Sequence, residues 1–190
     1  MDMLIRLHHR LFAAIERLAP EGLPLLARVT FAATLLGYFW ASAATKLGDG
    51  VFGILSPSTG AYAQIFPRQF EATGYDSSQL GVFHWLVTVA GTWAEFLLPL
   101  LIVAGLFTRL ASLAMIGFVA VQTLTDLYGH GALGQPETLG AWFDRVPDAP
   151  ILDQRLLWLA LLVPLVMLGA GALSLDRVLA RRAAPAGTPA

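Results

Sequence analysis

The stretch VFHWLVTVAGTWAEFLLPLLIVAGLF, residues 82–107, contains 26 residues and one charged side chain, Glu95. At 1.5 Å per residue, a helix of this length is longer than the roughly 30 Å hydrocarbon core of a bilayer. Three further apolar runs occupy residues 23–45, 110–128 and 156–175. We therefore predict an all-α, polytopic membrane protein in which four transmembrane helices form a bundle.

The composition of the whole chain supports the same class. Hydrophobic residues make up 56% of the 190 residues and charged residues only 13%, about half of the roughly 25% found in soluble domains. The four apolar runs hold just three charged residues, Arg28, Glu95 and Asp126. A net charge of −1 gives no basic field for binding nucleic acid. Because cysteine is absent, disulfides, thiol relays and iron–sulfur ligation within this chain are excluded.

The two ends of the chain differ from the membrane domain predicted for residues 23–179. In residues 1–22 the apolar positions recur at helical spacing, as Leu4, Leu7, Leu11, Ile15 and Leu18. Three arginines fall between them, so we predict an amphipathic helix that lies at the membrane interface. Residues 180–190 end in AAPAGTPA and have the composition of a disordered tail.

Basic residues are distributed unevenly along the chain, which predicts its orientation. The N-terminal segment, the short turn at Arg109 and the segment after residue 175 are rich in arginine, whereas the two long loops, 46–81 and 129–155, hold few basic residues for their length. By the positive-inside rule both termini are cytoplasmic and the two long loops face outward. We expect a multi-pass protein of the bacterial inner membrane, in contact with the lipid bilayer.

Both outer loops are rich in aromatic and turn-forming residues. Residues 46–81 contain Phe52, Tyr62, Phe66, Phe70 and Tyr75, among others, between prolines and glycines. This content predicts short helices at the interface or on top of the bundle. The loops are interpreted either as interfacial anchors or as a lid over a small-molecule site.

Glu95 is the deepest charge in the predicted bundle. His84, Thr88 and Glu95 share one helix face, because their spacings are close to whole helical turns. An ionisable group at this depth needs a partner. Two interpretations remain open: a carboxylate that accepts protons or binds a ligand, with His84 as a second proton-active group, or a structural ion pair, for instance with Arg28. Arg28 itself lies close enough to the inner surface to reach it.

A second polar group is predicted at the outer end of the bundle. Gln122, Asp126 and His130 recur at four-residue spacing in the third run. Asp126 and His130 could pair with Lys46 or His84 at the same level. A metal site built from His84, Asp126 and His130 is the alternative, but no sequence motif for a metal is present, and no metal ligand is assigned.

Several residues of the first two spans are candidates for a cavity wall. Arg28 and Lys46 are 18 residues apart, five helical turns, so both side chains leave the helix in one direction. Tyr38 lies on a small, hydroxylated face that also suits helix packing. Trp40 and Trp85 fit an aromatic belt or, alternatively, stacking against a flat ring such as a quinone.

Three strings resemble the DoxX family of small four-helix membrane proteins: LLARVTFAATLLGYFWASAATKL at 25–47, TWAEFLLPLLIVAGLFTRLASLAM at 92–115 and GAGALSLDRVL at 169–179. They place an arginine and a Lys-Leu pair at the two ends of the first span, a carboxylate before a Gly-Leu-x-Thr-Arg turn, and Ser-Leu-Asp near the end. Some members of the family resemble the small subunit of thiosulfate:quinone oxidoreductase. The resemblance implies that the protein is a membrane subunit associated with a redox system.

The first functional hypothesis is a membrane subunit that binds quinone, the candidate cofactor, or passes protons, and acts with a protein partner. Glu95 and His84 would be the proton-active groups, Arg28 and Lys46 the electrostatic anchors, and Tyr38 a ring contact with Trp40 and Trp85. The cavity candidates Thr88, Gln122, Asp126 and His130 complete the site. No catalytic motif, haem motif or flavin fingerprint is present. A non-catalytic membrane adaptor and a small-solute or metal-handling component are the alternatives.

Overall fold

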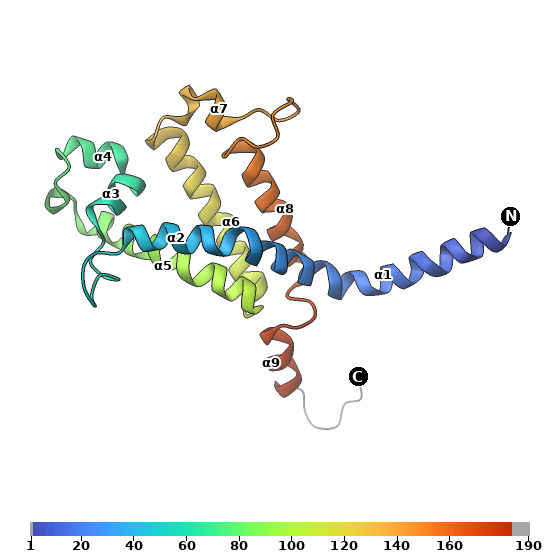
Figure 1. Ribbon diagram of the computed structural model, residues 1–190. Helices are drawn as coiled ribbons and strands as arrows, with labels where there is room; N and C mark the ends of the chain where they lie inside the picture. The colour runs from blue at the N-terminus through green and yellow to red at the C-terminus, as the bar shows by residue number, and fades with distance from the viewer. Residues whose placement is uncertain (1, 184–190) are drawn as a thin grey trace.

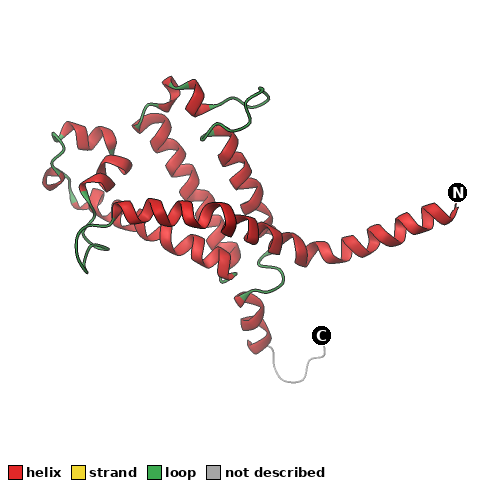
Figure 2. Ribbon diagram, viewed as in Figure 1, coloured by secondary structure: helices red, strands yellow, loops and turns green. Residues whose placement is uncertain are grey.

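The computed structural model describes residues 2–183, and the chain they form is helical, with no strand in this range (Figures 1 and 2). Three continuous helical stretches are long and apolar enough to cross a membrane: Asp2–Lys46, Val82–Ala104 and Thr108–Gly129. The helix of the fourth apolar run, α8 (Leu152–Leu168), has 17 residues. The all-helical membrane class is confirmed.

The first long stretch combines α1 (Asp2–Phe31), the π-helical turn η1 (Ala32–Leu36) and α2 (Gly37–Lys46) into 45 continuous residues. The helix has no interruption at residue 22, where we predicted a boundary. Its N-terminal part leaves the bundle and extends away from it (Figure 1). Apolar side chains of this part, such as Leu4 and Leu7, are exposed. The helix of the N-terminal segment is therefore continuous with the first span.

A tight turn joins α5 (Val82–Ala104) to α6 (Thr108–Leu124), which continues into the π-helical turn η3 (Thr125–Gly129). The helix α5 ends at Ala104, three residues before the predicted end at residue 107, and Gly105 follows it with a φ of 68°. A Cβ at Gly105 would lie 2.6 Å from the Ser174 Cβ, so only glycine fits. The first turn of α6 is capped from far along the chain: the Asp176 carboxylate accepts hydrogen bonds from the backbone N–H groups of Phe107 and Thr108 at 2.7 and 3.0 Å.

The fourth apolar run is helical over a different range from the one predicted. The helix α8 begins at Leu152 and ends at Leu168, rather than running from 156 to 175. It stops there because the chain adopts positive φ angles at Gly169, Gly171 and Leu173. The last helix, α9 (Leu175–Ala183), contains the first residues of the predicted disordered tail, and residues 184–190 of that tail lie outside the described residues.

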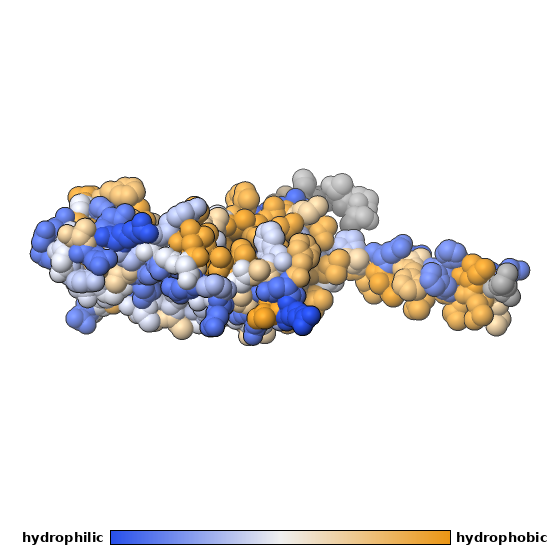
Figure 3. Space-filling view, turned by 90° about the horizontal axis from the view of Figure 1, so that it is seen from above, coloured by the Kyte–Doolittle hydropathy of each residue, from blue (hydrophilic) through white to orange (hydrophobic). Residues whose placement is uncertain are grey.

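The long helices pack around an apolar core. The helix α6 packs against α8 and α5, α1 against α8, and α2 against α5. Fully buried side chains from four of these helices meet at the centre, among them Phe39, Ile102, Met115 and Leu162. Much of the outer surface is also apolar, as the orange areas of Figure 3 indicate. Such a surface suits a lipid environment.

Both long connections contain short helices of their own. The first holds α3 (Thr59–Ile65), α4 (Pro67–Ala72) and the 3₁₀ turn η2 (Ser77–Gln79). The second holds the 3₁₀ turn η4 (Ala132–Gly134) and α7 (Pro136–Leu139). Residues of α3, η4 and α7 line the cavity described below. The connections thus contribute to the wall of the interior space of the molecule.

Candidate functional site

A cavity of about 870 Å³ lies among α2, α5, α6 and α8. Aliphatic and aromatic side chains form a large part of its wall, including Leu98, Phe118 and Trp158. Its polar lining comes from α2, the middle of α5, the end of α6 with η3, the first turn of α8 and the outer connections: Tyr38, Ser42, Lys46, Gln64, Glu95, Gln122, Thr125, Asp126, His130, Thr138, Gln154 and Arg155. An apolar space with a few polar groups is the usual form of a small-molecule site.

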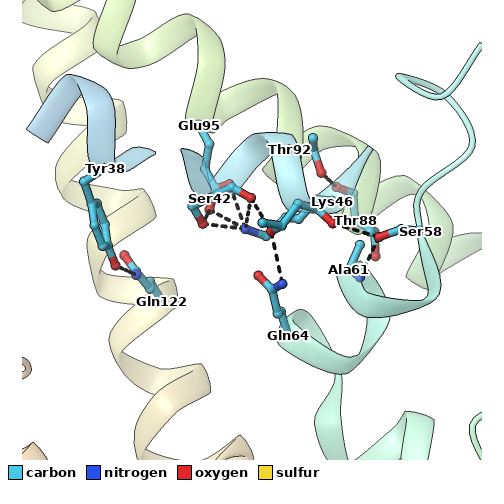
Figure 4. A network of polar contacts seen from close by, with 11 residues as sticks. Tyr38, Ser42, Lys46, Ser58, Ala61, Gln64, Thr88, Thr92, Glu95 and Gln122 are labelled. Carbon is cyan, nitrogen blue, oxygen red and sulfur yellow. Dashed lines mark hydrogen bonds and ion pairs between the residues drawn. The ribbon is translucent and has the colours of Figure 1, made fainter. Parts of the chain in front are cut away.

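Glu95 forms a buried ion pair with Lys46 in the wall of this cavity (Figure 4). The Lys46 Nζ donates to Glu95 Oε2 at 2.8 Å and to Oε1 at 3.0 Å. Ser42, one turn before Lys46 on α2, accepts from Nζ at 2.7 Å and donates to Glu95 Oε1 at 3.3 Å. Both charged residues are 5% exposed. The suggested pairing of Glu95 with Arg28 is therefore wrong.

Arg28 instead donates hydrogen bonds to main-chain oxygens at the other end of the bundle. Its guanidinium donates to the carbonyls that end α5 and to those of the turn after α8, namely Ile102, Val103, Ala170, Ala172 and Leu173. Carbonyls at a helix end lack intrahelical partners, and a cation there is favourable. Arg28 is 5% exposed, so it does not extend to the aqueous surface, and it does not line the cavity.

The partner of Asp126 is Arg155, in the first turn of α8. The predicted pairing of Asp126 with Lys46 or His84 is wrong. Only the Nη2 group of Arg155 is used in the ion pair, and its Nε and Nη1 groups are buried without a hydrogen-bond partner. Sequence reasoning missed Arg155 because it immediately precedes the fourth apolar run and was assigned to a loop. The signal was Asp126 itself, an acid within an apolar run that needs a cation nearby.

Two further polar contacts connect the helices around the cavity. The Gln122 side chain donates from Nε2 to the Tyr38 hydroxyl at 3.2 Å (Figure 4), and the Tyr38 ring packs against Trp158 at a centroid distance of 5.4 Å. His130 Nε2 lies 2.9 Å from the Gln64 main-chain oxygen and so connects the end of η3 to α3. Tyr38, Gln122 and His130 all lie in the lining of the cavity.

Other predicted site residues point elsewhere. His84 packs edge-on against Phe66, and Thr88 donates to the His84 main-chain oxygen. The indole of Trp40 donates to the carbonyl of Phe96, and that of Trp85 donates to the carbonyl of Leu55. Among the described residues that line the cavity, none of these four predicted residues appears. Trp158 is the tryptophan that faces the interior space.

The metal alternative receives no support from the geometry. Within residues 2–183, no three His, Asp or Glu side chains lie close enough together to hold a metal ion. Asp126 is paired with Arg155, and His130 contacts a main-chain oxygen. His84 packs between Phe66 and Phe83. The three residues of the predicted triad therefore lie in separate environments.

The order of these elements and their apolar character can be compared with known families. The DoxX family model matches residues 23–126, which is more than half of the chain. The chain belongs to the DoxX family. No curated protein and no solved structure matches it. The match to DoxX includes Arg28, Lys46 and Glu95 but ends before α8, so Arg155 lies outside it. Together with the long apolar helices, DoxX membership identifies a multi-pass membrane protein.

Proposed function

We propose that this DoxX-family protein is a membrane subunit that binds a lipid-soluble quinone in its interior cavity and acts with a redox partner. The observation that carries the proposal is the buried Lys46–Glu95 pair in the wall of a largely apolar cavity of about 870 Å³. Sites for organic cofactors are usually apolar spaces of about 300–1,000 Å³ with a few polar groups that set orientation. A ring with carbonyl oxygens and an apolar tail suits this lining.

Quinone chemistry explains why an ionisable pair would lie in an apolar wall. Reduction of a quinone to a quinol consumes two electrons and two protons. This chain has no cysteine for thiol or iron–sulfur chemistry, and in the proposed function a partner protein supplies or accepts the electrons through its own redox group. Lys46 and Glu95 are an ionisable pair in the wall of the cavity, and they relay protons between the quinone oxygens and water. His84 lies outside the cavity lining and has no direct part in this relay.

The proposal includes four membrane crossings, with α8 as the fourth. Its 17 residues extend about 25 Å, close to the thickness of the hydrocarbon core. Arginines are concentrated before the first crossing and after the fourth, which favours cytoplasmic termini and a bacterial inner membrane. In this orientation α3, α4 and α7 face outward and lie over the cavity side that contains His130 and Arg155.

A non-catalytic adaptor is the second candidate, and the outer connections favour it. Val51, Phe52 and Phe143 are apolar and almost fully exposed, as expected of side chains that meet a partner or the membrane interface. The two functions differ in their dependence on Glu95. An adaptor retains its partner and its cellular role in the Glu95→Gln variant, whereas a quinone-binding subunit loses its role with the same partner still bound.

The direct test is a titration of the purified protein in detergent with decylubiquinone. Trp158 lines the cavity, so binding is followed by quenching of intrinsic fluorescence, with Trp158→Phe to assign the signal. We expect saturable binding by the wild type and about tenfold weaker binding by Glu95→Gln. Glu21→Gln is the matched control, because Glu21 forms an exposed ion pair with Arg177 away from the cavity. Absence of saturable binding by the wild type would exclude the proposed function.

A further inference from the structure

The ion pair between Arg155 and Asp126 uses only part of the hydrogen-bonding capacity of the guanidinium. Arg155 is 7% exposed and lines the cavity. Its Nε and Nη1 groups have no partner among the described residues. Buried N–H groups are rarely left without an acceptor, and those of a charged group least of all. Two such donors on one side chain at a cavity wall indicate an acceptor that the ligand supplies.

An unused acceptor lies on the neighbouring helix. Gln122 donates to Tyr38 through Nε2, but its Oε1 is buried without a partner. Gln122 is one helical turn before Asp126, the residue that pairs with Arg155, and both Gln122 and Arg155 line the cavity. The ligand group that docks here must therefore accept hydrogen bonds and, in one of its forms, donate one.

The surrounding charges favour a ligand without net charge. The positive charge of Arg155 is already neutralised by Asp126, and that of Lys46 by Glu95. An anion bound at Arg155 would lie beside the Asp126 carboxylate and would lose its hydration without gaining an unpaired cation. A neutral carbonyl oxygen meets the same N–H groups without this repulsion.

The remaining lining supplies a surface for a flat ring. Trp158 follows Arg155 by three residues on α8 and so lies on the same face of that helix. Tyr38 packs against Trp158 and holds Gln122 through its hydroxyl. A planar ring in contact with these aromatic side chains can direct an oxygen substituent toward the guanidinium of Arg155.

From this geometry we propose that Arg155 and Gln122 bind the oxygen substituent of the ligand, which is a neutral ring carbonyl in the oxidised form and a hydroxyl in the reduced form. The carbonyl oxygen accepts from one of the Arg155 N–H groups that the ion pair with Asp126 leaves unused. After reduction the hydroxyl also donates to Gln122 Oε1. This assignment rests on the proposed quinone function and adds the residues that determine which ligand is bound and in which orientation.

The test compares three probes, which are decylubiquinone, decylbenzene and decanoate, on the purified full-length protein. Decylbenzene lacks an oxygen acceptor, and decanoate carries a negative charge. We expect the wild type to prefer decylubiquinone over both, and Arg155→Gln to weaken decylubiquinone binding at least tenfold. Arg177→Gln is the matched control, because it changes the same residue type at an exposed ion pair, and it should bind like the wild type. Gln122→Leu should weaken the quinol form more than the quinone form.

A second variant covers the case in which Arg155→Gln does not fold. Arg155→Lys keeps a cation for Asp126 but loses the further N–H groups of the planar guanidinium, and we expect about threefold weaker quinone binding. Binding of decylubiquinone with wild-type affinity by Arg155→Lys and Arg155→Gln would overturn the role of Arg155 and leave the proposed function intact. Binding of decanoate alone, dependent on Arg155, would overturn the quinone function and the neutral ligand. Binding of no probe by the wild type would overturn both proposals.

Discussion

The Lys46 ammonium lies 2.8 Å from the Glu95 carboxylate, and both side chains are almost completely buried between α2 and α5. The two residues are 49 positions apart in the sequence and come from different helices. Removal of two charges from water costs several kcal/mol for each ion, and their attraction and additional hydrogen bonds must offset this cost. Ser42 provides such hydrogen bonds to both charges. The pair therefore depends on all three residues being present.

Loss of one partner should destabilise the protein much more than loss of both. Lys46→Met leaves the Glu95 carboxylate buried without a cation, and we expect a loss of about 3–5 kcal/mol. The double variant Lys46→Met/Glu95→Leu should recover most of this loss, because no charge remains buried. Unfolding of the purified single and double variants measures the coupling. If the loss of stability in the double variant equalled the sum of the losses in Lys46→Met and Glu95→Leu, the buried ion pair would be contradicted.

Arg28 should be required for stability and not for ligand binding. Its guanidinium satisfies carbonyls at the end of α5 and in the turn after α8, so Arg28→Ala should cost about 3 kcal/mol or more. Arg28→Lys should restore little, since one ammonium cannot reach both sets of carbonyls. Thermal melting gives the stability, and a decylubiquinone titration at low temperature gives the binding. A variant with normal stability and lost binding would contradict this role.

Gly105 should not tolerate a side chain, in contrast to another glycine of the same hairpin. Gly105 has a φ of 68°, and its Cβ would lie within 2.7 Å of Arg28 and Ser174 atoms. We expect Gly105→Ala to destabilise the protein by more than about 1 kcal/mol. Gly117 lies within α6 with no atom within 4 Å of its Cβ position, so Gly117→Ala should be neutral or stabilise by about 0.5–1 kcal/mol. The two melting temperatures should therefore change in opposite directions or differ clearly in size.

The proposed orientation can be tested with single cysteines, because the chain has none of its own. Glu71→Cys lies in α4 and Ala180→Cys in α9, and both positions are exposed. In intact cells a membrane-impermeant maleimide should label the cysteine at 71 and not the one at 180. In inverted membrane vesicles the pattern should reverse. Labelling of both positions in intact cells would contradict four crossings with cytoplasmic termini.

The sequence predicted the helical class and the positions of the long helices because apolar length and charge depletion are local properties. The positions at which helices end depend instead on backbone conformation and on contacts between distant segments. The fourth apolar run continues to residue 175, yet the helix ends at Leu168, where Gly169 takes a positive φ and the main chain turns toward Arg28. Hydropathy does not distinguish an apolar turn from an apolar helix, so this end could not be located from composition.

The candidate site was predictable in part for the same reason. Glu95 and Asp126 were recognised because acids in apolar runs are rare, but their partners depend on how the helices pack. Lys46 reaches Glu95 through its long side chain, while Arg28, on the same side of the same helix, is directed to main-chain oxygens. Arg155 was missed because it stands just before the fourth apolar run, and nothing in the neighbouring sequence indicates that its side chain is buried. Only the packing of α8 against α6 brings it to Asp126.

The set of hydrogen bonds made by Arg28 also has a consequence for the order in which the protein is assembled. Its first acceptors lie 74 residues further along the chain, and the others more than 140 residues further. A ribosome that inserts the first helix into the membrane has not yet made any of them. During synthesis Arg28 must therefore remain near lipid headgroups or water, and the first helix can settle at its final depth only after the end of α5 and the turn that follows α8 have emerged.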